Sequence, residues 1–232
     1  MTCIIGLVCK DGVLIASDRR IVRGPEALEE KKIHELKIDE KVVGVIAAAG
    51  LTGMLDNFLE ESFLEMTARR IINLKELKES MEDAAYRIYS RYSQRLEEDA
   101  GINAFIACLQ NLSSGKAKLY ELYANGYMAE IKTYNSLGSS APLTLPFLKA
   151  TYHNNLTLEQ ATKLTTFIIL YIQEFELDRN VGGKPVIALV KHKEGVKFLN
   201  EEEINKLVDE TKPLIKTYQN KLLELLNLKL TT

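Results

Sequence analysis

Residues 1–20 read Met1-Thr2-Cys3-Ile4-Ile5-Gly6-Leu7-Val8-Cys9-Lys10-Asp11-Gly12-Val13-Leu14-Ile15-Ala16-Ser17-Asp18-Arg19-Arg20. The stretch from Cys3 to Cys9 is apolar at both sets of alternating positions, which is typical of a strand covered on both faces. Lys10-Asp11-Gly12 supplies a turn, because Asp-Gly favours the positive φ angles of a tight hairpin. Since Val13 to Ser17 is apolar again, we predict a buried β-hairpin here.

Thr2, just before this hairpin, carries chemistry of its own. If Met1 is removed, Thr2 carries a hydroxyl and a free α-amine on one residue. Such an amine titrates at about pH 7.7–8.0, so it can accept the hydroxyl proton directly or through one water. Thr2 is therefore a candidate nucleophile if Met1 is cleaved, and an ordinary strand residue if it is not.

Composition excludes several classes of partner. The 232 residues are 46% hydrophobic and 27% charged, with a formal net charge of −2, which gives no electrostatic footprint for nucleic acid or an anionic membrane. No apolar run approaches the roughly 20 residues that span a bilayer. Lys10, Asp11 and Asp18 interrupt any signal-peptide pattern. We therefore expect a cytoplasmic protein that binds neither nucleic acid nor membranes.

The cysteines and histidines show no ligand spacing. They are Cys3, Cys9, Cys108, His34, His153 and His192. An odd number of cysteines without a C-x-x-C pair argues against both a disulfide framework and a zinc site. We expect the cysteines to be small buried residues, and we expect no metal and no cofactor.

Hydrophobic periodicity outlines the rest of the chain. After the first hairpin it predicts strands at 32–38, 42–49, 102–109, 117–124, 127–133, 186–191 and 196–199. It predicts helices around 55–66, at 74–96 and at 157–174, the last opened by a capping box from Thr157 to Gln160. A final helical region follows Asn200, and we expect Pro213 to divide it.

Strands that are apolar on both faces need cover on both faces. Two sheets packed face to face, with helix pairs outside them, meet that need. We therefore predict an α+β fold, a four-layer αββα sandwich. No linker or repeat interrupts the pattern, so we expect a single domain over residues 1–232, with 200–232 as a helical C-terminal extension.

This layout and a set of short motifs resemble the β-type subunits of archaeal and bacterial proteasomes, which are N-terminal-nucleophile hydrolases. The motifs are residues 2–20, Lys31-Lys32-Ile33, Ala49-Gly50-Leu51, Gly138-Ser139-Ser140-Ala141-Pro142, and Asp178 followed by Gly182-Gly183. The resemblance implies a threonine endopeptidase of the Ntn-hydrolase fold. It also implies assembly into a homo-oligomeric ring that encloses the proteolytic sites.

By this resemblance, Thr2 attacks the peptide carbonyl and Lys32 places an ammonium beside its hydroxyl. Asp18 pairs with Lys32 and keeps it charged. The alternatives are a surface aspartate and a solvated lysine pair. The segment from Lys32 to Gly50 looks longer than the archaeal pattern, most simply an evenly extended hairpin, so Lys31 or Lys37 could be the true counterpart.

The resemblance assigns the remaining roles to Gly50, Ser139 and Asp178. The Gly50 N–H would bind the oxyanion, although a turn glycine is the simpler alternative. Ser139 and Asp178 would orient the Thr2 amine. Val181 stands where the family has a second serine, three residues after the aspartate, and whether Asn180 replaces that serine is open.

The resemblance also implies partners. Substrates would be peptides or unfolded proteins, supplied by an α-type ring or an ATPase unfoldase. The alternatives are an amidase or transpeptidase on the same fold, and an inactive structural ring subunit, which Val181 favours. An apolar stripe near the C-terminus could cover this chain's own core or a neighbouring subunit; it comprises Ile215, Tyr218, Leu222, Leu225 and Leu226.

Overall fold

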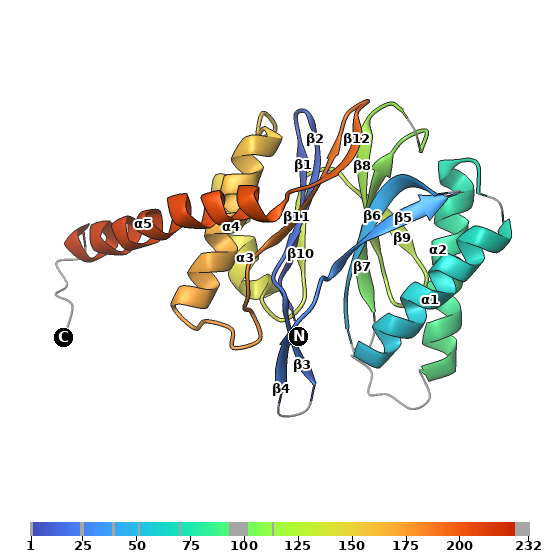
Figure 1. The fold of residues 1–232 in the computed structure, drawn as a ribbon, viewed down its shortest axis with the longest axis horizontal. Helices are drawn as coiled ribbons and strands as arrows, with labels where there is room; N and C mark the ends of the chain where they lie inside the picture. The colour runs from blue at the N-terminus through green and yellow to red at the C-terminus, as the bar shows by residue number, and fades with distance from the viewer. Residues whose placement is uncertain are drawn as a thin grey trace.

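Two antiparallel sheets lie face to face, and helices cover the outer face of each (Figure 1). The computed structural model describes residues 2–23, 26–38, 40–50, 52–69, 71–92, 102–112 and 114–225. The predicted four-layer αββα architecture is confirmed.

The first sheet contains the N-terminal hairpin at its centre. Its strand order is β10-β1-β2-β11-β12, with bounds β1 Ile4–Cys9, β2 Gly12–Ser17, β10 Tyr134–Leu137, β11 Val186–Lys191 and β12 Gly195–Phe198. The hairpin register pairs Ile4 with Ser17 and Cys9 with Gly12. The predicted hairpin is therefore confirmed, and the residue after β2 is brought back beside the residues before β1.

The second sheet has the order β5-β6-β7-β8-β9. Its strands are β5 Ile33–Ile38, β6 Lys41–Ala49, β7 Asn103–Leu109, β8 Ala117–Leu122 and β9 Met128–Ile131. The β5–β6 hairpin is not evenly paired, because its register shifts between Leu36 and Lys37. This bulge lies beyond the start of β5 and leaves the pairing of Ile33 with Ala47 regular.

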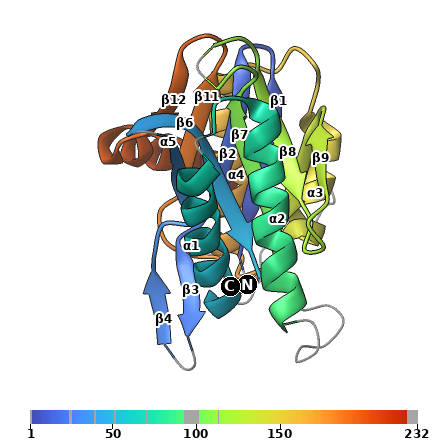
Figure 2. The same cartoon turned by 90° about the vertical axis from the view of Figure 1, so that its right-hand side faces the viewer.

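Helices α1 (Thr52–Arg69) and α2 (Leu74–Tyr92) cover the second sheet (Figure 2). The prediction extended the second of these to residue 96, but residues 93–96 lie outside the described part. Helices α3 (Ala141–Thr151), α4 (Leu158–Glu174) and α5 (Glu201–Leu225) lie on the side of the first sheet (Figure 1). None of the helices in the described ranges is long and apolar enough to cross a membrane.

Each strand of the first hairpin serves two cores. In β1, Ile4 packs between the sheets with Phe105 and Leu119, whereas Ile5 and Leu7 pack against the helices of the first sheet. A third core lies between the second sheet and α1–α2. Cys3, Cys9 and Cys108 are buried and free, as predicted for small apolar residues. The apolar character of β1 on both faces is thus explained by its central layer.

Three strands were not predicted. Periodicity predicts no strand in residues 20–31, but β3 (Arg20–Arg23) and β4 (Glu26–Glu29) pair there as a small hairpin below the sandwich (Figure 1). β10 follows β9 directly and pairs with β1 at the edge of the first sheet. Its sequence, Tyr134-Asn135-Ser136-Leu137, has no regular alternation, so periodicity could not find it.

The expectation that Pro213 divides the last helix is wrong, because α5 runs unbroken through it. A proline in a helix removes the hydrogen bond to the carbonyl four residues earlier. Here that carbonyl belongs to Asp209, and both residues are exposed, so water can satisfy it. Thr211 and Ile215 are buried on either side and hold the helix against the body.

The apolar stripe on α5 divides into two parts. Ile215 is buried, and the Tyr218 ring lies 5.9 Å from the rings of Phe167 and Tyr171 on α4. Leu222 and Leu225 are exposed on the part of the helix that projects from the body (Figure 1). Leu226 lies outside the described residues. The first part of the stripe therefore covers this chain's own core.

Candidate active site

The buried carboxylate of Asp18 organises the site from the position just after β2. Five groups donate to it: Thr2 Oγ1 (3.1 Å), Cys3 N (3.0 Å) and Lys32 Nζ (2.6 Å) to Oδ1, and Arg20 N (3.0 Å) and Gly182 N (3.1 Å) to Oδ2. The side chain has no solvent exposure. A buried carboxylate is tolerated only when it is paired and hydrogen-bonded, and Asp18 is both. It joins the start of the chain, the segment before β5 and the segment before β11.

Lys32 supplies the cationic partner of Asp18. Burial lowers the pKa of the Lys32 ammonium below its ordinary value, while the nearby Asp18 charge opposes that shift. Lys31 is exposed, and Lys37 is exposed and pairs with Glu35 at 3.0 Å. Of the three candidate lysines, Lys32 is therefore the one that the structure places at Asp18.

Thr2 is held by the turn between β10 and α3. The residue is 4% exposed, and its carbonyl oxygen accepts a hydrogen bond of 3.3 Å from the Ser140 hydroxyl. Gly138 has φ +92°, and a Cβ on it would lie 2.0 Å from that same carbonyl oxygen. Only glycine combines this backbone angle with so close an approach. The sequence flagged this turn but gave Gly138 and Ser140 no role.

Ser139 and Asp178 form a unit next to this turn. The Ser139 hydroxyl donates to Asp178 Oδ2 at 2.5 Å, and Asn180 donates to Oδ1 from its backbone N (2.9 Å) and from Nδ2 (2.8 Å). Burial raises the pKa of the Asp178 carboxyl, but these hydrogen bonds outweigh it and the pKa is lowered. Among the described hydrogen bonds, none joins Ser139 or Asp178 to the Thr2 side chain.

Val181 lacks the hydroxyl that the resemblance predicts at its position. Its side chain is buried in the core beneath α3–α5. The neighbouring Asn180 provides both donors to Asp178 Oδ1. The carboxylate of Asp178 is thus hydrogen-bonded on both oxygens without a second serine.

Cys3, the other potential nucleophile at the site, is unsuited to that role. Burial raises the pKa of its thiol to about 12. Since the thiolate is the reactive form, Cys3 is inert near neutral pH. Thr2 therefore stays the candidate nucleophile beside Asp18.

Gly182 is a second glycine on which the site depends. Its N–H donates to Asp18, and its carbonyl accepts from Arg19 N (2.9 Å) and Arg20 N (3.1 Å). A Cβ on Gly182 would lie 2.3 Å from the Arg20 guanidinium. In the sequence, the Gly182-Gly183 pair before a buried strand marked this segment as part of the motif set. The sequence did not show that the pair packs against residues 18–20.

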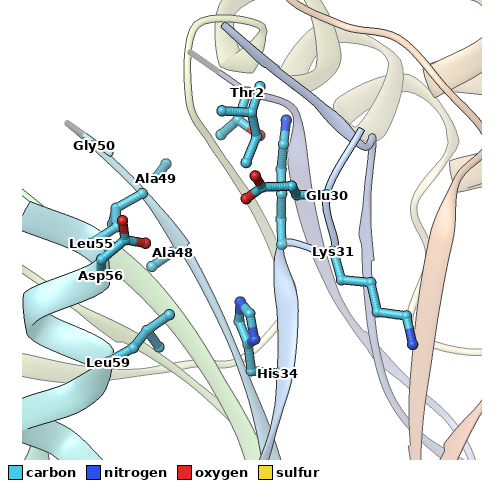
Figure 3. A pocket seen from close by; sticks show the side chains of 12 residues that line it. Thr2, Glu30, Lys31, His34, Ala48, Ala49, Gly50, Leu55, Asp56 and Leu59 are labelled. Atoms are coloured by element: carbon cyan, nitrogen blue, oxygen red, sulfur yellow. The ribbon is translucent and has the colours of Figure 1, made fainter. Parts of the chain in front are cut away.

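A cavity of about 100 Å³ opens beside Thr2 (Figure 3). Its walls come from the segment before β5, the end of β6 and the first turns of α1. The lining residues are Thr2, Ile21, Glu30, Lys31, Lys32, His34, Ala48, Ala49, Gly50, Leu55, Asp56 and Leu59. Gly50 is exposed at the end of β6, on the same cavity as Thr2. In the described part of the chain no group of three or more His, Cys, Asp or Glu side chains is placed to hold a metal ion.

The fold defines the class of protein. A four-layer αββα sandwich with a nucleophile candidate at the start of its central strand is the fold of the N-terminal-nucleophile hydrolases. In agreement, the structure superimposes on Anbu, described as an ancestral β-subunit, from Yersinia bercovieri, with a TM-score of 0.76, 15% identity and full coverage of both chains. Anbu from Hyphomicrobium sp. strain MC1 gives 0.74 at 15% identity, with 94% of this chain and 97% of that chain covered.

The chain belongs to the proteasome subunit family, whose model matches residues 1–183. It is 28% identical to the proteasome subunit beta of Methanocaldococcus vulcanius over 211 residues, which is 91% of either chain. It is 27% identical to that of Methanothermobacter thermautotrophicus, covering 90% of this chain and 94% of that protein. The proteasome subunit alpha of Methanocaldococcus jannaschii is 26% identical, with coverages of 90% and 77%.

Proposed function

We propose that this protein is a threonine endopeptidase whose nucleophile is Thr2, exposed by removal of Met1. One observation carries the proposal: the Thr2 hydroxyl lies 3.1 Å from an Asp18 carboxylate that is itself 2.6 Å from the Lys32 ammonium, at the edge of a cavity. The chemistry of a free N-terminal threonine needs a nearby cation, and this constellation supplies one.

In the proposed reaction, the free Thr2 amine takes the proton of the hydroxyl, directly or through one water. The hydroxyl oxygen then bonds to the peptide carbonyl carbon, and negative charge develops on the carbonyl oxygen. The Gly50 N–H stabilises that charge, and Lys32 stabilises the developing alkoxide. Asp18 holds Lys32 in place and keeps it protonated despite its burial.

The peptide C–N bond then breaks, and the leaving amine takes the proton from the Thr2 amine. A water next attacks the threonine ester, which releases the acid and restores the hydroxyl. Ser139 and Asp178 would orient the amine, and the packing of the Gly138–Ser140 turn on the Thr2 backbone supports this role. The Asp178 charge also acts on Lys32, which supports their closeness.

The proposal extends to the assembly. As a member of this family, the chain would form a homo-oligomeric ring in the cytoplasm. Peptides or unfolded proteins would be its substrates, with an α-type ring or an ATPase unfoldase as the partner that feeds them. The names of the curated relatives, proteasome subunit beta, support this reading.

The test combines N-terminal sequencing with a covalent acylating probe. We expect mature protein to begin at Thr2 and to carry the probe there. Thr2→Ala should abolish labelling and peptide cleavage, whereas Thr2→Ser should retain part of both because it keeps the hydroxyl and amine.

Three results would decide against the proposal. Mature protein that begins at Thr2 but takes no probe would favour the inactive structural subunit that Val181 suggests. Transfer of the acyl group to an added amine, in preference to water, would instead establish a transpeptidase. A Thr2→Ala variant that cleaves peptides with full activity would contradict the mechanism.

A further inference from the structure

Ser140 occupies the N-cap position of α3, just before the first helical residue. Serine is favoured there because its hydroxyl oxygen accepts a hydrogen bond from a backbone N–H of the first helical turn. Within the described helix, the Ser140 side chain makes no such bond. Only its backbone carbonyl serves the helix, accepting from Leu143 N and Thr144 N at 2.9 Å each. The hydroxyl is therefore available to another segment.

That other segment is the start of the chain. The Ser140 hydroxyl donates to the Thr2 carbonyl oxygen at 3.3 Å, and it also lies within hydrogen-bonding reach of the Cys3 thiol. Ser140 has no solvent exposure. A buried hydroxyl is costly unless it is hydrogen-bonded, and here its partners belong to Thr2 and Cys3.

The peptide group between Thr2 and Cys3 is consequently held on both sides. Its N–H donates to Asp18 Oδ1 at 3.0 Å, and its carbonyl oxygen accepts from Ser140. The N–H and the carbonyl point to opposite sides of one rigid plane, so these two bonds fix its orientation. The orientation of this plane sets the direction in which the Thr2 Cα presents its hydroxyl and its amine.

An N-terminal threonine depends on such anchors more than an internal residue does. Once Met1 is removed, the chain holds Thr2 from one side only. The Thr2 hydroxyl is a further anchor, since it donates to Asp18 at 3.1 Å. In the proposed reaction that hydroxyl gives up its proton, so this bond is lost when alignment matters most. The two bonds to the Thr2–Cys3 peptide group then remain.

We propose that Ser140 is a positioning residue for the reaction at Thr2: by holding the Thr2 carbonyl, it keeps the hydroxyl and the amine aligned while the proton moves between them. The inference rests on the proposed function, because it assigns Ser140 a task in a step that Thr2 performs. Ser140 acts through the Thr2 backbone and is not among the residues that line the cavity. It therefore governs the rate of acylation and leaves substrate binding unaltered.

The test measures how fast the acylating probe labels Thr2 in the mature chain, in the assembly that it forms, over a range of probe concentrations. We expect Ser140→Ala to lower the maximal labelling rate about tenfold, because small misplacements of reacting groups slow a reaction strongly. The half-saturating probe concentration should stay within about twofold. Peptide cleavage should divide in the same way, with a lower kcat and an unchanged KM.

A second variant, Ser140→Gly, also lacks the hydroxyl, and glycine is well tolerated at an N-cap. It should reproduce the result of Ser140→Ala, and it carries the test if the alanine variant does not fold. Urea unfolding of each variant shows which of them are folded under the conditions of the assay.

Ser136→Ala is the matched control. The Ser136 hydroxyl donates to the Ile4 carbonyl at 2.9 Å, and Ser136 is also buried. The control therefore removes the same kind of hydrogen bond, from a serine to a backbone carbonyl, two residues further along the chain than Thr2. It should lower the urea midpoint about as much as Ser140→Ala does and leave the labelling rate at that of the unmodified protein.

Equal maximal labelling rates in Ser140→Ala and Ser136→Ala, in protein whose unmodified form is labelled at Thr2, would overturn this inference alone. A change confined to the half-saturating concentration would also overturn it, because it would place the role of Ser140 in binding. If the unmodified mature protein takes no probe at Thr2, the proposed function fails and this inference fails with it.

Discussion

Asp18 shows how one residue can fix the relative positions of three segments. Its two oxygens accept hydrogen bonds from groups near residues 2, 20, 32 and 182. A buried carboxylate with so many donors is costly to disturb, because each donor would be left without a partner. The candidate nucleophile and its candidate cation are thus positioned by the same side chain.

The pH profile should report the state of Lys32. Activity should rise through about pH 7.7–8.0 as the free Thr2 amine loses its proton. Burial lowers the pKa of Lys32 from 10.5, so its ammonium should lose its proton, and activity should fall again, as the pH rises through that lowered pKa. The measurement is kcat/KM against pH.

The Lys32→Arg variant provides the check on that profile. A guanidinium stays protonated over the whole range, so the variant's residual activity should lack the alkaline fall. Lys37→Arg is the matched control, since Lys37 is exposed and away from Asp18, and its profile should be unaltered. An alkaline fall that persists in Lys32→Arg would contradict the assignment.

At the scale of elements, short turns hold the site more than the long strands do. The β10–α3 turn packs against the Thr2 backbone, and the segment before β11 packs against Asp18. Both depend on a glycine where a side chain would collide with backbone or a guanidinium.

Gly138→Ala should therefore cost more stability than a positive φ alone explains. Gly195 is the matched control: it has φ +97°, but nothing lies within 4 Å of an added Cβ. We expect Gly195→Ala to lower the free energy of unfolding by about 1 kcal/mol. Gly138→Ala should lower it by about 3 kcal/mol or more and reduce activity, because Thr2 must move.

Urea unfolding of the two alanine variants measures this difference. Equal losses of stability in both would show that the contact with Thr2 contributes nothing beyond backbone strain.

At the scale of the molecule, the two sheets depend on one another. Phe105 of β7 is fully buried between them, and Gly6 of β1 lies so close that a Cβ there would be 3.0 Å from the Phe105 ring. Thr2 lies just before β1 of the first sheet and Gly50 just after β6 of the second, so this packing sets the distance across the candidate site.

Phe105→Ala should lower the free energy of unfolding by about 3–5 kcal/mol, because it leaves a cavity in the closed layer between the sheets. Leu64→Ala on α1 is the control, since Leu64 is 61% exposed, and it should change stability by less than about 0.5 kcal/mol. Thermal or urea unfolding measures both. A small effect of Phe105→Ala would mean that the layers are held mainly elsewhere.

The sequence by itself determined the layers and most of the candidate site. Apolar residues on both faces of residues 3–9 required cover on both sides, and local turn chemistry located the first hairpin. The motif resemblance selected Thr2, Asp18 and Lys32, and the structure brings Thr2 and Lys32 each within hydrogen-bonding distance of Asp18.

Only the tertiary structure decided which lysine meets Asp18, what Gly138 and Gly182 are for, and what faces the cavity. These depend on contacts between segments far apart in the chain: Asp18 with Gly182, and Thr2 with Ser140. Packing against the rest of the molecule also decides that α5 continues unbroken through Pro213. Periodicity and propensity describe a segment and its neighbours along the chain, whereas a site forms where distant segments pack together, so its geometry exists only in the folded molecule.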